Sequence, residues 1–161
     1  MVFFLLTLGL ALSGSGASAQ TAESGAIEKL SFLVGSWHCV IEGAKVPKGD
    51  VSTARYQFSP DRSWLIEYES LRERGRSHWS MQIWGYNALQ QKLVAYDFSA
   101  AGVLTKSVDG WVGGEFKSKR DQDGATVTIV PHTRDSFDWK IVTANGSTTV
   151  IESCRRSAAA E

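Results

Sequence analysis

The chain is poor in the residues that build metal centres, with two cysteines and three histidines among 161 residues. Their spacing matches no common pattern of zinc ligands. Its longest apolar run, Val2 to Leu12, is well short of the roughly 20 residues that a membrane-spanning helix needs. Acidic and basic residues balance at 17 each, so nothing draws the protein to nucleic acid or to anionic lipid in general. We therefore expect no metal site, no nucleic-acid partner and no stable membrane insertion.

Catalytic motifs are also scarce. No Gly-x-Ser-x-Gly elbow occurs, and His38, His78 and His132 lie far apart in the sequence. We expect no catalytic residues, and a binding protein is favoured over an enzyme. An enzyme that uses Glu152 or His78 as a base is the least favoured of the three functional hypotheses that the sequence allows, after the two binding functions described below.

The N-terminus has the features of a secretory signal peptide. Residues 1–19 carry no charged side chain, and their apolar run leads to Ala17-Ser18-Ala19, a small-x-small cleavage site. We expect a periplasmic or secreted protein in which residues 20–161 form a single domain.

The rest of the chain alternates between apolar and polar residues, with turn signals about every eight to twelve residues. The exception is a short helix expected over 26–34 and ended by Gly35. We predict an all-β fold, an antiparallel up-and-down closed barrel of about ten strands. The predicted strands are 36–43, 50–58, 63–73, 76–86, 91–98, 103–109, 113–120, 125–130, 136–144 and 147–156.

The two cysteines, Cys39 and Cys154, fall in the first and last of these strands. An even strand count makes those strands antiparallel where they meet, and pairing the cysteines sets Trp37 opposite Arg156. We predict a disulfide that closes the barrel, since an oxidising compartment permits one. Two free buried thiols are the alternative.

Hairpin turns assign faces to the strands. Asn145-Gly146 favours a type I′ turn, which places Trp139 opposite Glu152. Together with the cysteine pairing and Asp123-Gly124, it predicts an inward face that includes Trp37, Cys39, Ile41, Phe116, Val127, Ile129, Phe137, Trp139, Ile141, Val150, Glu152 and Cys154.

The hairpin around Arg74-Gly75 has one mainly apolar and one polar face. Ile66, Tyr68, Trp79, Met81 and Ile83 share the first, and Glu67, Glu69, His78, Ser80 and Gln82 share the second. We expect the apolar face to line the barrel and the polar face to meet water. The alternative is a lumen-facing polar patch suited to acid–base work. Pairing Phe58 with Ser63 puts Arg55 on the apolar face as an internal cation, unless a bulge turns it outward.

The segment Leu33-Val34-Gly35-Ser36-Trp37 resembles the opening of calycin-type barrels, the lipocalins and their relatives. This resemblance implies that Trp37 closes the bottom of the barrel and that an Arg near the last strand, here Arg156, covers its ring. With Trp84-Gly85-Tyr86-Asn87 and Asp109-Gly110-Trp111, the layout is similar to a bacterial calycin-like exported family of unknown function, distantly related to the nitrobindins.

Nitrobindin-like proteins hold haem through a histidine in the C-terminal part of the barrel. This chain has no histidine after His132, and its last strand carries Cys154 instead. No cofactor is therefore expected, and haem would require the loop of His132 to fold over the barrel mouth.

The leading hypothesis is a monomeric exported barrel that binds a small, hydrophobic, lipid-like or aromatic ligand. The candidate ligand-binding residues are Trp37, Arg55, Tyr68, Trp79, Met81, Trp139 and Glu152. The second hypothesis is a protein-binding module, such as a barrel-type protease inhibitor acting through the segment around Ala22 to Gly25.

Overall fold

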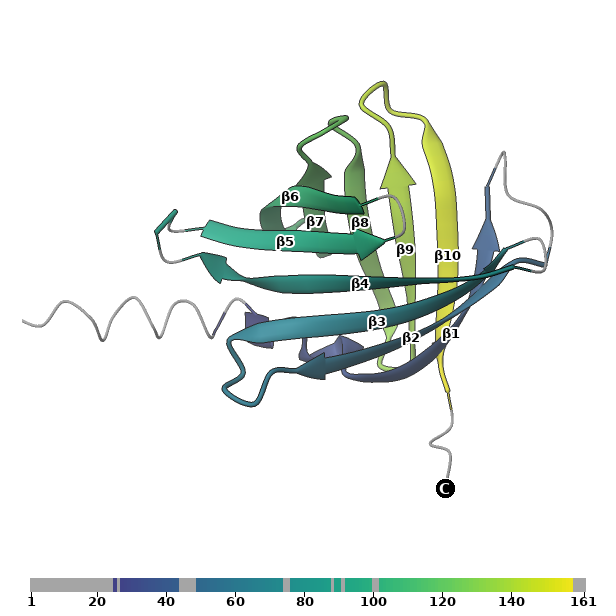
Figure 1. Ribbon diagram of the computed structural model, residues 1–161, viewed down its shortest axis with the longest axis horizontal. Helices are drawn as coiled ribbons and strands as arrows, with labels where there is room; N and C mark the ends of the chain where they lie inside the picture. Colours follow the sequence, from purple (N-terminus) through teal and green to yellow (C-terminus); the bar gives the residue numbers. More distant parts are fainter. Residues whose placement is uncertain are drawn as a thin grey trace, which may run out of the picture.

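The chain folds as a closed antiparallel β-barrel (Figure 1). The computed structural model describes residues 25, 27–43, 49–73, 76–87, 89–90, 92–99 and 102–157. Across these residues run the strands β1 (Gly35–Glu42), β2 (Val51–Phe58), β3 (Trp64–Glu73), β4 (Arg76–Asn87), β5 (Lys92–Ser99), β6 (Gly102–Val112), β7 (Glu115–Arg120), β8 (Thr126–Thr133), β9 (Ser136–Val142) and β10 (Thr148–Arg156). The predicted signal peptide, residues 1–19, lies outside the described residues.

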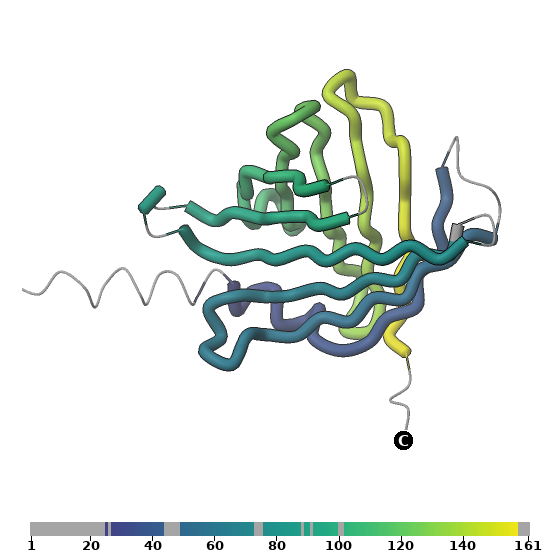
Figure 2. The backbone as a smooth tube through the Cα atoms, in the orientation of Figure 1, coloured from purple at the N-terminus to yellow at the C-terminus, as the bar shows by residue number. Residues whose placement is uncertain are grey.

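Each strand pairs with its neighbours in sequence, and β1 pairs with β10 to close the ring. In the tube of Figure 2 the first strand, purple, and the last strand, yellow, come together at this closure. Cys39 lies opposite Cys154 and Trp37 opposite Arg156, and the two cysteines form a disulfide. The predicted fold class, closing register and disulfide are thus confirmed, and the ten-stranded barrel fits a calycin-like fold.

One end of the barrel is closed by the segment before β1. The helix expected over 26–34 is present only in part. Ile27 and Glu28 are helical, a 3-10 turn, η1, covers Ser31–Leu33, and Ala26 lies outside the described residues. Leu30 and Leu33 are completely buried. They pack with Trp37 and Phe137 in the apolar core, so this turn plugs the barrel.

Arg156 fastens the plug to the last strand. Its guanidinium lies 4.3 Å from the centre of the Trp37 ring and donates hydrogen bonds to the carbonyls of Phe32 (2.8 Å) and Val34 (2.7 Å). The Trp37 indole donates to the Leu33 carbonyl at 2.6 Å. The arrangement implied by the calycin resemblance, an Arg over the closing Trp, is therefore present.

The turn between β9 and β10 differs from the type I′ prediction. Gly146 has a positive φ, whereas Asn145 does not, and the connection is wider because Thr143 N–H donates to the Ser147 carbonyl. The Asn145 side chain accepts from the Ser147 N–H instead. An irregularity between Thr148 and Val150 restores the predicted pairing of Trp139 with Glu152, so the faces are as expected.

The orientation predicted for the β3–β4 hairpin is wrong. Its pairs are as predicted, with Tyr68 opposite Met81 and Glu67 opposite Gln82. However, Glu67 and Gln82 are each only 4% exposed, whereas Tyr68 is 47% exposed and Trp79 67%. The glutamates therefore point into the barrel and the aromatic side chains point out.

The reason lies in the pairing of β1 with β2. Cys39 lies opposite Ser52, which puts Ser52, Ala54 and Tyr56 inside, and Ala54 then lies opposite Glu69. Side chains alternate strictly along a strand, so the inward face of β1 fixes that of β3. No tight-turn signal joins β1 to β2, so the sequence does not give the register between these two strands. The orientation of the β3–β4 hairpin was therefore predicted only from which of its faces is more apolar.

No helix among the described residues has the length and apolar character required to cross a membrane.

Candidate functional site

A layer of polar side chains crosses the middle of the barrel interior, above the apolar plug. It contains three carboxyl groups, from Glu67 and Glu69 on β3 and from Glu152 on β10. Strands β1 and β2 lie between β10 and β3. Their inward side chains Cys39 and Ala54 connect the inward faces of the two strands that carry the glutamates. Residues distant in sequence thus form one acidic cluster.

Glu67 is the most buried member of this cluster. Its Oε1 accepts a 2.6 Å hydrogen bond from the Tyr56 hydroxyl. Burial, with the negative charge of Glu69 second, raises the pKa of Glu67 to about 8, although Tyr56 and Lys106 oppose the shift. Burial likewise raises the pKa of Tyr56 well above its usual value. At neutral pH Glu67 is therefore mostly protonated.

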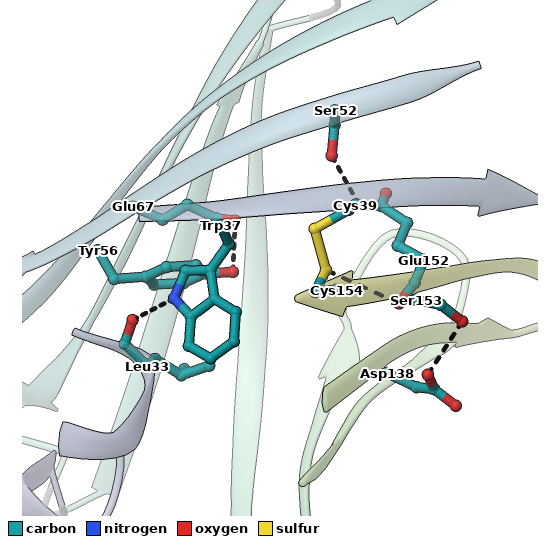
Figure 3. The surroundings of a disulfide bond; sticks show 10 residues. All are labelled: Leu33, Trp37, Cys39, Ser52, Tyr56, Glu67, Asp138, Glu152, Ser153 and Cys154. Atoms are coloured by element: carbon teal, nitrogen blue, oxygen red, sulfur yellow. Dashed lines mark hydrogen bonds between the residues drawn. A yellow bond between two sulfur atoms is a disulfide. The ribbon is translucent and has the colours of Figure 1, made fainter. Parts of the chain in front are cut away.

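Glu152 lies beside the disulfide (Figure 3). Its Oε2 accepts a hydrogen bond from the Ser52 hydroxyl at 3.2 Å. Burial raises the pKa of Glu152 well above its usual value, and the carboxylates of Glu69 and Glu67 add to this effect. Glu69 in turn accepts from the Ser80 hydroxyl at 3.0 Å. Protonated carboxyls can donate as well as accept hydrogen bonds, so the cluster offers both functions.

Lys106, from β6, extends the polar layer to the other wall. It is 2% exposed, and its ammonium group donates to Gln82 Oε1 at 2.7 Å and lies 3.4 Å from Asp97 Oδ2. Burial lowers the pKa of Lys106, whereas the charges of Asp97 and Glu67 raise it. This lysine is paired with its neighbours rather than available to an incoming anion.

The acidic cluster surrounds a small cavity of about 10 Å³, lined by Cys39, Ala54, Tyr56, Glu67, Glu69, Gln82, Trp139, Glu152 and Cys154. A space of this size holds about one water-sized group. Two buried polar atoms of its lining, Glu67 Oε2 and Trp139 Nε1, have no hydrogen-bond partner among the described residues. Because unpaired buried polar atoms are unfavourable, the cavity is suited to a bound group. Trp139 Nε1–H is a donor, and Glu67 Oε2 donates when Glu67 is protonated and accepts when it is ionised.

The end of the barrel opposite the plug has an aliphatic inner wall. Leu71, Ile141 and Val150 point inward, and each nevertheless keeps part of its surface exposed. Inward side chains that reach solvent mark an end of the barrel that water enters. A ligand that reached the acidic cluster would pass these side chains.

The structure divides the seven predicted ligand-binding residues into two groups. Trp139 and Glu152 line the cavity, and Trp37 lies below it in the plug. Arg55, Tyr68, Trp79 and Met81 belong to the outer face, and their predicted place in the lumen is wrong. Arg55 in particular is exposed and cannot be the internal cation.

Sequence reasoning missed Tyr56, Ser52 and Lys106. Tyr56 and Ser52 alternate with Arg55 and Thr53 on β2, and a known register between β1 and β2 identifies them as inward. Lys106 gives no local signal, because Thr105 and Ser107 on either side are also polar. Glu67 and Gln82 share the face that the sequence predicts to meet water. The structure turns this face inward, as in the alternative of a lumen-facing polar patch.

The histidines do not join this site. His38 and His78 are exposed, and His132 Nε2 lies 3.1 Å from Asp138 Oδ2 on the neighbouring strand. Among the described residues, potential metal-binding atoms converge within 4.8 Å at Cys39, Glu152 and Cys154. The two sulfur atoms are bonded to each other, so they are not thiolate ligands.

The sequence matches no protein-family model and no curated protein. Among solved structures, the chain is similar to a redesigned β-barrel, with 10% identity and a TM-score of 0.49, over 83% of this chain and 96% of that one. A de novo designed fluorescence-activating β-barrel matches with 12% identity and a TM-score of 0.46, over 79% and 95%. A redesigned β-barrel bound to DFHBI matches with 16% identity and a TM-score of 0.44, over 81% and 98%.

Proposed function

We propose that this protein is a non-catalytic barrel that binds a small molecule with an apolar body and a head that is a primary amine or another hydrogen-bond donor. The observation that carries this proposal is Glu67 Oε2, which has no hydrogen-bond partner in the part of the chain that the structure describes. The Glu67 side chain is 4% exposed, in a cavity shared with Glu69 and Glu152. An ammonium or hydroxyl group placed there supplies the missing hydrogen bond.

The charge of the site supports this choice of head group. A carboxylate ligand, such as a fatty acid, would approach Glu67, Glu69 and Glu152, and the cation of the layer, Lys106, is already engaged by Asp97 and Gln82. Burial and the neighbouring carboxyl groups already raise the pKa values of Glu67 and Glu152, so the same poorly solvated interior disfavours a further anionic group. The interior therefore favours a cationic or neutral head over an anionic one.

The apolar body of the ligand would lie along the aliphatic wall at the end opposite the plug. Leu71, Ile141 and Val150 are only partly buried there, and covering them removes further apolar surface from water. The head fills the water-sized cavity while the body extends toward the open end. This arrangement of apolar walls around a few polar groups is typical of small-molecule sites.

Export forms part of the proposal. The Cys39–Cys154 disulfide is compatible with an oxidising compartment, and residues 1–19 have the composition of a signal peptide. We place the protein in the periplasm or outside the cell, in a calycin-like exported family.

Calorimetric titration with n-octylamine, n-octanol and n-octanoate tests the function. We expect octylamine to bind most tightly and octanoate least. Because ammonium binding drives the proton from Glu67, whose pKa is about 8, octylamine affinity should rise with pH by up to about tenfold per unit below pH 8.

The matched variants are Glu67→Gln in the cavity and Glu42→Gln, an exposed glutamate on β1. Glu67→Gln should remove most of the pH dependence of octylamine binding, whereas Glu42→Gln should leave it unchanged. Octanoate binding as tight as octylamine binding, or an unchanged pH profile in Glu67→Gln, would contradict the proposed head group.

A further inference from the structure

The outer face of β3, β4, β5 and β6 carries an apolar surface that the barrel itself does not use. Trp79 is 67% exposed, Val103 55% and Tyr68 47%. One row of register partners runs Tyr68, Met81, Phe98 and Val103, and the next runs Ile66, Ile83, Tyr96 and Thr105. We call these two rows, with Trp79 and Ser70 beside them, the outer apolar face. None of these positions carries a charge.

A groove lies at one end of the outer apolar face. It has a volume of about 290 Å³ and is lined by Ser59, Trp64, Ile66, Ile83 and Tyr96. Trp64 packs flat over Gly85, where any Cβ atom would overlap its ring. Gly85 thus lets the indole lie close to the sheet as one wall of the groove.

Trp79 stands at the opposite end of the same face. It precedes Ile83 by four residues on β4, which is about 14 Å along a strand. Met81 lies midway between this exposed indole and the groove. The surface therefore has a large apolar projection and an apolar depression placed on either side of a single residue.

We propose that the outer apolar face binds a second copy of this chain in a two-fold symmetric dimer. The symmetry axis lies between the two faces and crosses β4 at the level of Met81. This operation brings Trp79 of each copy over the groove of the other, and it brings Met81 close to its own symmetry mate. The two contacts are identical, as a two-fold interface requires.

Size and charge agree with this occupant. Five residues along β4 and four adjacent strands span roughly 14 Å by 14 Å between backbones, or roughly 400 Å² with side chains. That is about half of the roughly 800 Å² per partner of a standard interface, so it suits the apolar centre of one. Polar residues at its edge, namely Thr53, Gln57 and the exposed Arg55 opposite Tyr68, would form the rim, whereas the centre is uncharged and opposes no like charges.

The sequence led us to expect a monomer and apolar strand faces that point inward. The β3–β4 hairpin instead points its aromatic side chains outward, which leaves an apolar surface for a partner. The dimer leaves the interior and both barrel ends free, so its test is independent of the ligand proposal.

Sedimentation velocity of the full mature chain over a concentration series is the first test. We expect a monomer–dimer equilibrium that added salt does not weaken, because the contact is uncharged. Trp79→Ser should weaken dimerisation by at least about 30-fold, as expected for a Trp that fills a groove of the partner copy. Val40→Ser is the control, because Val40 is 43% exposed but lies on β1, outside this face, and it should dimerise like the wild type.

Crosslinking gives a second readout that locates the axis. After mild oxidation, Met81→Cys should form a disulfide-linked dimer through residue 81, whereas Val40→Cys should remain monomeric. A wild-type protein that is monomeric throughout the series overturns the proposal. Equal dimerisation of Trp79→Ser and wild type, or crosslinking of Val40→Cys but not of Met81→Cys, overturns it as well.

Discussion

At Glu67 the alternation of β3 carries a carboxyl group into the barrel, where a Tyr56 hydroxyl satisfies one of its oxygens. The interior keeps this group neutral by raising its pKa to about 8, because an ionised buried carboxyl is far costlier than a protonated one. An apolar side chain of similar size would avoid this cost. The glutamate therefore lowers stability at the position where the head group of the proposed ligand would bind.

This protonation predicts a pH-dependent stability. Below about pH 4.5 Glu67 is protonated in both states, and between about 4.5 and 8 only the folded state keeps the proton. The free energy of unfolding should thus fall by up to about 1.4 kcal/mol per pH unit in this window and level off above pH 8. The pKa of Glu152 is also raised in the folded protein, so Glu152 likewise lowers the free energy of unfolding as the pH rises.

Urea unfolding at several pH values measures the slope in wild type, Glu67→Gln and Glu42→Gln. Glu67→Gln should unfold with a shallower slope and be more stable than the wild type at pH 8, since Gln still accepts from Tyr56. Glu42→Gln should keep the wild-type slope. Parallel curves for wild type and Glu67→Gln would mean that Glu67 is ionised in the folded protein.

At the scale of elements, the plug depends on one side chain of the last strand. Arg156 donates to carbonyls of Phe32, Val34 and Arg134 and to Asp135 Oδ1. It joins η1, β10 and the β8–β9 connection into one end of the barrel. Its planar guanidinium also covers the Trp37 ring, which a lysine ammonium does not reproduce.

Arg156→Lys should accordingly lower the free energy of unfolding by about 2–3 kcal/mol, since several hydrogen bonds from a charged group are lost together. The adjacent Arg155→Lys is the matched control, because Arg155 is exposed on the outer face and its replacement should have little effect. Chemical unfolding of both variants measures the difference. Equal stability of the two would show that the plug is held by apolar packing alone.

The elements also explain why local pattern misplaced the β3–β4 hairpin. The face predicted to be polar also carries Leu65 and Trp84, which are buried, and the face predicted to be apolar also carries Ser70. A hairpin taken alone has no reason to turn one face inward. The inward face is set by β1 and β2, and the outward turn of Trp79 and Tyr68 creates the outer apolar face.

At the scale of the whole molecule, the disulfide joins residues 115 positions apart and ties the closing pair of strands. A crosslink over so long a segment restricts the unfolded chain strongly. It also fixes the register of β1 against β10, from which the position of Glu152 opposite Ile41 follows.

Replacing both cysteines by alanine should lower the free energy of unfolding by about 4 kcal/mol. Urea unfolding compares the double variant with the oxidised wild type, and the reduced wild type is the control for the loss of the covalent bond alone. A change below about 1 kcal/mol would mean that β1 and β10 stay associated in the unfolded chain.

The strand pattern, the closing pair and the inward faces of β7, β8, β9, β10 and β1 could be predicted from the amino-acid sequence. Those features follow from alternation, turn residues and two cysteines, which act over short distances or through a single bond. The inward face of β3 and β4 depends on the closed barrel, because ring closure carries the register of β1 through β2 to Glu67. The same closure brought Glu67, Glu69 and Glu152 around one cavity and left Trp79 on the outside, since a side chain's environment depends on strands far from it in sequence.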